Sequence, residues 1–231
     1  MICFIDYRCS KEEIKSLEKL SLNPIKVPKC NNLYEAINGH VDIQLHIIDT
    51  NHIMVQKDIS IDFLNELKIN EINYSFSNNN LTSSYPQDII LNAYSNANLF
   101  VHNLSYTDKN LLRLQKNKKK IHVKQGYTKC SILPVNENAI ITSDKSIYNA
   151  LTKENMDVLL IPPADILLPS LNYGFIGGTG GLISENKIAF FGELKNYAYG
   201  KEVYNFLYKY DVEPVSLRKG KLIDRGSLFI L

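Results

Sequence analysis

Three features common among nucleic-acid-binding, membrane and secreted proteins are missing from this sequence. The 231 residues carry 26 Lys and Arg against 24 Asp and Glu, a net charge of +2. No overall basic field would therefore attract nucleic acid or an anionic membrane. No apolar run approaches the ~20 residues of a membrane-spanning helix, and the start lacks the basic and apolar regions of a signal peptide. We expect a cytoplasmic protein that binds neither nucleic acid nor membrane.

The cysteines are few and widely separated. Cys3, Cys9, Cys30 and Cys130 form no CxxC pair, so their spacing predicts neither a zinc site nor a disulfide framework. We expect free thiols, no metal and no cofactor. Hydrophobic residues make up 45% of the chain and charged residues 22%, as in ordinary globular proteins. No compositional boundary is visible, so we expect residues 1–231 to form a single domain.

What the sequence does contain is an internal repeat. Segments that begin at Gly39, Gly126 and Gly174 align without a gap, and each has Asn-x-Ile twelve residues after its glycine. A degenerate copy begins at Pro86 and a shortened one near Gly220, which gives five copies at spacings of 47, 40, 48 and 46 residues. Repeats of this length usually correspond to one supersecondary unit each.

Each repeat predicts two strands, a helix and a third strand. Apolar positions lead to a polar Asn turn and resume after it, which is typical of a β-hairpin. Helical spacing and, in the first case, a Ser-x-x-Glu capping box then follow. The predicted helices span 10–22, 107–116, 143–155 and 199–210, and each precedes a short apolar strand. The stretch 75–84 is predicted to be a loop.

The fifth copy lacks its second hairpin strand because the sequence stops at Leu231. The apolar pattern of residues 2–5 matches that strand in the fourth copy. We therefore expect residues 2–5 to pair with residues 227–231 and close the structure.

Five ββαβ units closed by a strand from the other terminus resemble the pentein α/β propeller. The chain is similar to the guanidino-group-modifying superfamily, which includes arginine and agmatine deiminases, dimethylarginine hydrolases and amidinotransferases. The resemblance implies an α/β fold with five blades around a pseudo-fivefold axis, hairpins inside and helices outside. A ribosome anti-association factor uses the same fold without catalysis, so the fold alone does not decide function.

In such a ring the first hairpin strands surround a central channel, and alternate residues of a strand share one face. The resemblance therefore places polar side chains from all five units near the axis. These candidates are His40, Asp42, Gln44, Asp88, Asn92, Lys129, Cys130, Ser131, Thr179, Asp224, Arg225 and Ser227.

Enzymes of this superfamily use a Cys nucleophile, a His that moves protons and carboxylates that bind the cationic substrate. His40-Val41-Asp42 resembles their His-x-Asp/Glu motif, and Cys130 resembles the nucleophile that follows a glycine. The resemblance implies catalytic roles for Cys130, His40 and Asp42. It implies substrate binding by Asp88, Thr179, Asp224, Arg225 and Gln44.

Each signal also has a purely structural interpretation. Cys130 precedes the apolar Ile132 and Leu133, and buried cysteine is common as a small hydrophobic residue. Strand alternation predicts that Lys129 and Cys130 do not both face the channel. His40 and Asp42 would share a face, for a joint role or for a simple hydrogen bond. The glycines of 174–181 precede a strand rather than a helix, which predicts close packing instead of a phosphate site.

Two functions remain open. The first is a Cys-dependent hydrolase or amidinotransferase that acts on a guanidine-like small molecule. The second is a non-catalytic propeller that binds a small ligand or a protein partner. Thiol reactivity separates them, because an activated Cys130 would be alkylated well below neutral pH.

Overall fold

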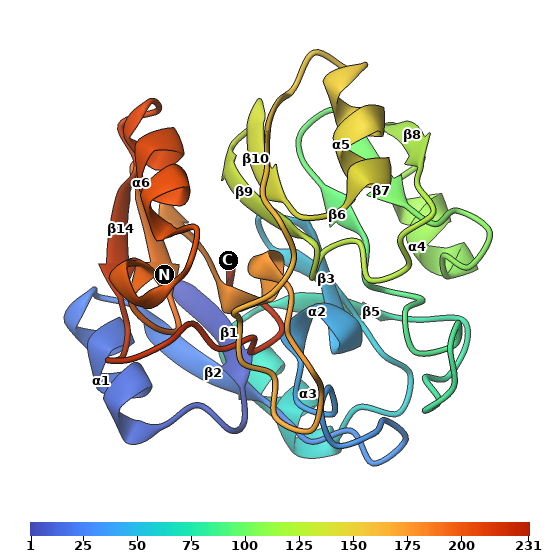
Figure 1. The fold of residues 1–231 in the computed structure, drawn as a ribbon. Coiled ribbons are helices and arrows are strands. Elements are labelled where there is room, and N and C mark those ends of the chain that lie inside the picture. The colour runs from blue at the N-terminus through green and yellow to red at the C-terminus, as the bar shows by residue number, and fades with distance from the viewer.

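Five three-stranded sheets lie around a central axis in the computed structural model, which describes all residues 1–231 (Figure 1). In each sheet the middle strand pairs antiparallel with one neighbour and parallel with the other. The helix of each unit connects its two parallel strands and lies on the outside of the ring. The predicted ββαβ unit and the five-bladed α/β propeller are confirmed.

The units follow one another around the ring in chain order. The first contains β3 (Leu45–Asp49), β4 (His52–Val55), α3 (Ile61–Ile69) and β5 (Asn73–Phe76). The second contains β6 (Tyr94–Ser95), β7 (Leu99–His102), α4 (Lys109–Leu114) and β8 (Lys119–His122). The third contains β9 (Ile132–Asn136), β10 (Ala139–Thr142), α5 (Lys145–Thr152) and β11 (Asp157–Leu160).

The fourth unit contains β12 (Gly180–Ser184), β13 (Lys187–Phe190), the 3-10 turn η2 (Leu194–Asn196), α6 (Gly200–Tyr208) and β14 (Glu213–Ser216). The fifth combines both ends of the chain as β15 (Phe229–Ile230), β1 (Ile2–Asp6), α1 (Lys11–Lys19) and β2 (Asn23–Val27). Two short helical segments, α2 (Val41–Gln44) and η1 (Ile176–Thr179), precede β3 and β12. No helix has the length and apolar character needed to cross a membrane.

The ring closes where the two ends of the chain meet. Strand β1 lies between β15 and β2, with Phe4 opposite Phe229 on one side and Ile25 on the other. Ile2 and Leu231 exchange two backbone hydrogen bonds, of 3.1 and 2.9 Å. The predicted pairing of residues 2–5 with the last strand is confirmed, and it leaves neither hairpin strand of this unit without a partner.

The repeated Asn acts through its backbone carbonyl and does not adopt the left-handed backbone conformation that its turn propensity would favour. Asn51, Asn138 and Asn186 each occupy the second position of a two-residue hairpin turn, yet none has a positive φ. Instead, the backbone carbonyl of each accepts a hydrogen bond from the first residue of the third strand, at 2.8 to 3.0 Å. The turn thus links the hairpin to the strand that returns after the helix.

Helices begin at the residues that the sequence indicates. The capping box at α1 is present, since Ser10 Oγ accepts from the Glu13 amide and Glu13 Oε2 accepts from the Ser10 amide. The helix and third strand of the first unit, α3 and β5, were not located from the sequence, although Ser60 caps α3 and Phe63 faces the core. The predicted loop 75–84 therefore starts two residues later, because Ser75 and Phe76 belong to β5.

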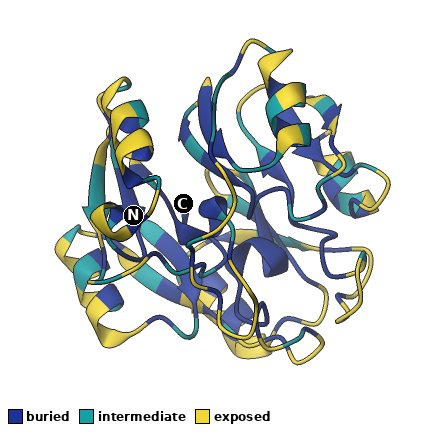
Figure 2. Cartoon of the chain, in the orientation of Figure 1, coloured by how far each residue is buried: buried dark blue, intermediate teal, exposed yellow.

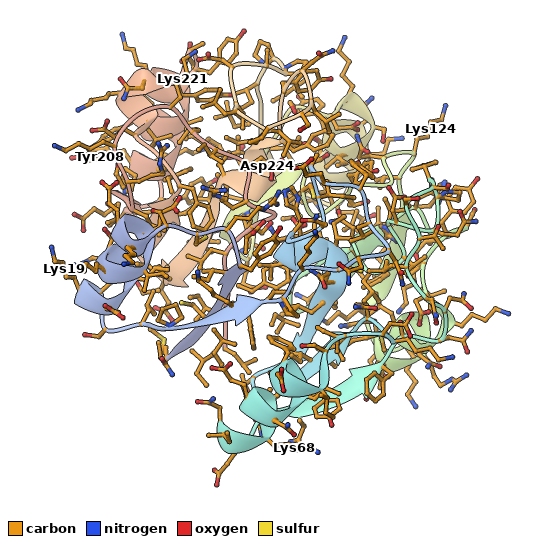
Figure 3. All side chains as sticks on the ribbon, turned by 90° about the horizontal axis from the view of Figure 1, so that it is seen from below. Lys19, Lys68, Lys124, Tyr208, Lys221 and Asp224 are labelled. Carbon is orange, nitrogen blue, oxygen red and sulfur yellow. The ribbon has the colours of Figure 1, made fainter.

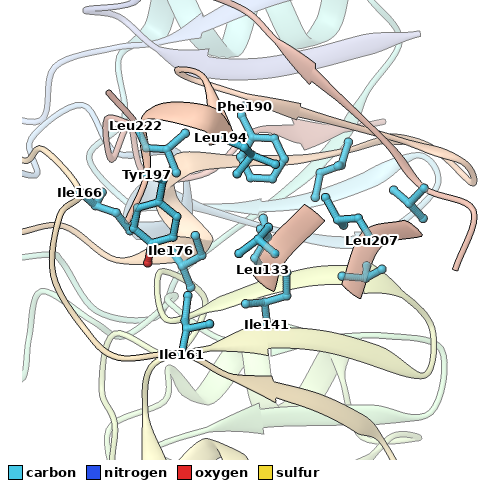
Figure 4. Packing of buried hydrophobic residues seen from close by; sticks show 14 of the residues in the cluster. Leu133, Ile141, Ile161, Ile166, Ile176, Phe190, Leu194, Tyr197, Leu207 and Leu222 are labelled. Atoms are coloured by element: carbon cyan, nitrogen blue, oxygen red, sulfur yellow. The ribbon is translucent and has the colours of Figure 1, made fainter. Parts of the chain in front are cut away.

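The core lies between neighbouring blades. Leu133 and Ile141 of the third unit pack against Phe190 and Leu207 of the fourth (Figure 4). The innermost strands are buried, while the outer faces of the helices are exposed (Figure 2). Each sheet thus buries its apolar side chains against its neighbours, and the polar residues of the axis are held between them.

Candidate active site

The polar residues predicted for the first hairpin strands lie instead in the turns that precede those strands. Asp42 and Gln44 belong to α2, Thr179 to η1, and Cys130 to a turn just before β9. The prediction that these residues share strand faces is therefore wrong. Figure 1 shows α2 and the segment of η1 close to the middle of the ring.

Hydrogen bonds between these turns explain why the chain does not stay extended at the axis. The backbone amide of Asp42 donates to the backbone carbonyl of Gly226 at 3.0 Å. The backbone amide of Lys129 donates to the backbone carbonyl of Asn92 at 3.1 Å. The amide of Ser227 donates to Gly178 at 3.1 Å. Buried backbone groups need such partners, and each turn finds them in a neighbouring unit.

A pocket of about 260 Å³ opens beside these turns. It brings together three of the predicted residues, His40, Cys130 and Asp224, with a largely apolar wall. The other lining residues are Tyr34, Ile37, Tyr127, Leu168, Leu171, Asn172, Tyr173 and Phe175.

A separate and larger hollow, of about 760 Å³, is lined by the first hairpin strands of all five units. This hollow matches the predicted central channel. Of the twelve polar candidates, only Lys129 lines it. Lys129 and Cys130 therefore face different cavities, as predicted, although they do so from a turn rather than from a strand.

The Cys130 thiol is held by two polar partners. Its Sγ donates to Asp42 Oδ1 at 3.2 Å and accepts from the Asn92 side-chain amide at 3.2 Å. The side-chain oxygen of Asn92, Oδ1, in turn accepts hydrogen bonds from the backbone amides of Lys129 and Cys130, at 2.9 and 3.2 Å. Burial, together with the nearby carboxylates of Asp42 and Asp224, raises the pKa of Cys130 well above its usual value. In this state the thiol is protonated at neutral pH.

His40 and Asp224 face each other across the pocket wall. His40 Nε2 lies 3.9 Å from Asp224 Oδ1, and neither ring nitrogen has a hydrogen-bond partner although both are buried. The Asp224 carboxylate accepts from the amides of Phe175 and Gly226 at 2.8 and 2.9 Å. Burial raises the pKa of Asp224, an effect that His40 partly offsets. His40 thus lines the pocket with two buried ring nitrogens that have no hydrogen-bond partner.

The glycine cluster makes room for these side chains. A Cβ on Gly178 would lie 1.8 Å from Asp224 Oδ1, and one on Gly174 would lie 2.4 Å from Asp224 Cβ. A Cβ on Gly177 would lie 2.6 Å from the Cys130 carbonyl oxygen. The prediction that these glycines serve close packing is confirmed.

Behind the pocket, a buried hydrogen-bond chain connects Lys129 to Asp42. Lys129 Nζ donates to Ser227 Oγ at 2.9 Å, and Ser227 Oγ donates to Asp42 Oδ2 at 2.7 Å. Burial lowers the pKa of Lys129. The two oxygens of Asp42 therefore contact Cys130 on one side and this chain on the other.

Four of the predicted substrate-binding residues do not line the pocket. Asp88 lies behind it and accepts from the Tyr127 hydroxyl. Gln44 donates to backbone carbonyls at 2.8 and 3.1 Å, and Thr179 donates to the Ile176 carbonyl at 2.7 Å. Arg225 faces the carboxylate of Glu13, 3.6 Å away. Each of these four side chains contacts another group of the chain through a hydrogen bond or an ion pair. No sequence pattern predicts these contacts.

The aromatic wall was missed at the sequence level. The rings of Tyr127 and Phe175 stack at 6.0 Å, and Tyr34 shares a hydroxyl contact of 3.2 Å with Tyr127. Tyr127 follows Gly126 directly, so its place in the repeat was an available signal. Tyr34 lies in an irregular segment that has no place in the repeat, so no such signal was available for it.

The three residues first proposed as catalytic form a compact group. A ring nitrogen of His40, a carboxylate oxygen of Asp42 and the sulfur of Cys130 all lie within 4.8 Å of one another. Nitrogen, oxygen and sulfur donors suit a metal such as zinc as well as proton transfer and nucleophilic chemistry. Here two of the three are hydrogen-bonded directly to each other.

Solved structures with a similar fold are described as an amidinotransferase, a DDAH and an agmatine deiminase. SxtG, an amidinotransferase of the saxitoxin biosynthetic pathway from Microseira wollei, is 11% identical with a TM-score of 0.58, over 93% of this chain and 74% of that one. DDAH from Pseudomonas aeruginosa, complexed with citrulline, is 9% identical with a TM-score of 0.53, over 94% and 91%.

A third similar structure is agmatine deiminase of C. jejuni, 10% identical with a TM-score of 0.53, over 94% of this chain and 86% of that one. These likenesses confirm the pentein resemblance at the level of the fold. No curated protein sequence matches the chain. A family model matches residues 4–229, and the chain therefore belongs to the family of unknown function DUF6873.

Proposed function

We propose that this protein is a Cys-dependent hydrolase or amidinotransferase that acts on a guanidine-like cation. One observation carries the proposal: Cys130, His40 and Asp224 line one pocket. Asp42 lies directly behind the thiol. A nucleophile, a proton carrier and a carboxylate for a cation are thus within reach of one bound molecule.

A bound guanidinium would change the state of the thiol. Asp42 and Asp224 help to raise the pKa of Cys130 because their negative charges disfavour a thiolate. A planar cation paired with Asp224 offsets that charge, so the thiolate forms more readily once substrate is present. Cys130 then passes its proton to His40, whose ring nitrogens have no other partner.

The covalent step follows from this arrangement. The thiolate sulfur bonds to the guanidinium carbon, and the C–N bond to one nitrogen breaks as that nitrogen takes the proton from His40 and leaves as ammonia or an amine. The product is a thiouronium on Cys130. Attack by water would release a urea, whereas attack by a second amine would release a new guanidine. Either attack restores the thiol.

The test is release of ammonia, amine or urea from a panel of guanidines that includes arginine, agmatine and methylated arginines. We expect turnover of at least one compound by the wild-type protein and a loss of several orders of magnitude in Cys130→Ala. Intact-mass measurement would detect the thiouronium adduct. The control is Cys30→Ala, since Cys30 is also buried, lies in the same apolar cluster and does not line the pocket.

The alternative is a non-catalytic propeller that binds a cation in the same pocket. The observation in its favour is that the free protein keeps Cys130 buried as a protonated thiol. Binding of a guanidine by the wild type without turnover, adduct or an effect of Cys130→Ala on product formation would establish this alternative instead.

A further inference from the structure

The pocket is lined by an acidic side chain but by no Lys or Arg. Asp224 is an acid, His40 and Cys130 can exchange protons, and the remaining eight lining residues are tyrosines, other uncharged aromatic or aliphatic residues and one Asn. No Lys or Arg is among them. In Figure 3, Asp224 lies near the middle of the molecule, while the labelled lysines project from its periphery.

The cations that lie closest in the fold are committed elsewhere. Arg8 pairs with Asp6, its Nε lying 2.9 Å from Oδ1, and its Nη1 donates to two backbone carbonyls at 2.9 and 3.2 Å. Lys129 is bonded to Ser227 and lines the other hollow. Arg225 faces Glu13. None of these three cations lines the pocket in which a ligand would bind.

The outer wall is apolar and aromatic. Phe175 stacks on Tyr127 and meets the edge of Tyr173 at 6.4 Å. Leu171 and Tyr173 are 49% and 44% exposed, so they lie where the pocket meets solvent. A carboxylate placed along this wall would lose water and gain no charged partner, whereas an apolar or aromatic group would gain contact area.

We propose that the substrate of this pocket is a guanidine-type cation whose tail bears no carboxylate and is apolar or aromatic. The inference rests on the proposed function and narrows its substrate class. It excludes free amino acids such as arginine, which carry an α-carboxylate, as the preferred substrates. It favours guanidines in which that group is absent, amidated or replaced by a hydrophobic tail.

The test compares ligands that differ in one group, with Cys130→Ala as the binding protein so that turnover does not interfere. Calorimetry with argininamide and arginine isolates the carboxylate. We expect argininamide to bind at least tenfold more tightly, and benzylguanidine to bind more tightly than methylguanidine. Equal or tighter binding of arginine would overturn the inference while leaving the proposed function intact. Absence of binding by every guanidine would overturn both.

A charge introduced at the rim gives a second, independent readout. In the Cys130→Ala background, Leu171→Arg should supply the missing cation and reduce the preference for argininamide over arginine severalfold. Leu167→Arg is the matched control, because Leu167 lies in the same segment, is 46% exposed and does not line the pocket. An unchanged preference in Leu171→Arg, or an equal change in Leu167→Arg, would contradict the inference.

Discussion

The Cys130 thiol donates a hydrogen bond to Asp42 Oδ1 over 3.2 Å, and both side chains are buried. A thiol in this position is not an activated nucleophile by itself, since burial and the two nearby carboxylates raise its pKa. We therefore do not expect the free protein to be alkylated at Cys130 well below neutral pH, which would be the sign of an activated thiol. A cation bound in the pocket would be needed to lower the pKa of Cys130 and make the thiol reactive.

The first prediction concerns the charge of an alkylating reagent. At pH 7, chloroacetamidine, a planar cation, should label Cys130 at least tenfold faster than the neutral chloroacetamide, because Asp224 attracts the cation and the cation favours the thiolate. Peptide mapping by mass spectrometry measures both rates. Cys30 serves as an internal control, with no preference for the cation. Equal rates at Cys130 would show that the pocket does not bind cations.

The second prediction concerns pH and Asp224. Burial raises the pKa of Asp224 in the folded protein above its ordinary value of 3.8. The stabilising effect of this group is fully present below the unfolded pKa and is lost as pH rises through the folded pKa. Asp224→Asn should therefore gain stability relative to wild type as pH rises from about 4 to 7.

Urea unfolding at several pH values between 4 and 7 measures this difference. Glu18→Gln, an exposed carboxylate on α1, is the control and should show a much smaller change. A difference between Asp224→Asn and wild type that stays constant over this range would mean that burial does not penalise the Asp224 charge.

The third prediction concerns ring closure. Phe4 is fully buried in β1, opposite Phe229 and 6.1 Å from the ring of Phe63. Phe4→Ala should lower the free energy of unfolding by about 3–5 kcal/mol, because it leaves a cavity where the two ends of the chain meet. Urea unfolding measures the loss. Ile69→Ala, on a side chain 81% exposed, should change stability by less than about 0.5 kcal/mol.

The fourth prediction concerns the structural contribution of Cys130, the proposed nucleophile. Cys130 is 2% exposed and packs in an apolar cluster with Phe100 and Leu168. Cys130→Ala should therefore cost about 1 kcal/mol or more of unfolding free energy. Differential scanning calorimetry at fixed pH measures the effect. A variant as stable as the wild type would indicate that the thiol faces solvent rather than the core.

Local chemistry made much of the fold predictable. The spacing from glycine to Asn-x-Ile located three hairpins, and the degenerate copy at Pro86 located a fourth. Ser10 with Glu13 located α1, and residues 2–5 were matched to the missing strand. Helix α3 was equally predictable, since Ser60 caps it and Phe63, Leu64 and Leu67 share its buried face. The hairpins and helices depend on neighbours within a few residues, and the closing strand was predictable because its apolar pattern repeats that of another unit.

The site depended on contacts between distant residues. The repeats and the pentein resemblance predicted that His40, Asp42, Cys130 and Asp224 would lie close together near the middle of a propeller. The folded structure was needed to show that turns rather than strands carry them, and that Gln44, Thr179 and Arg225 contact other parts of the chain instead of facing the pocket. The physical reason is that buried polar groups must find partners. Some of these partners are far away in the sequence, as Ser227 and Asp42 are, 185 residues apart.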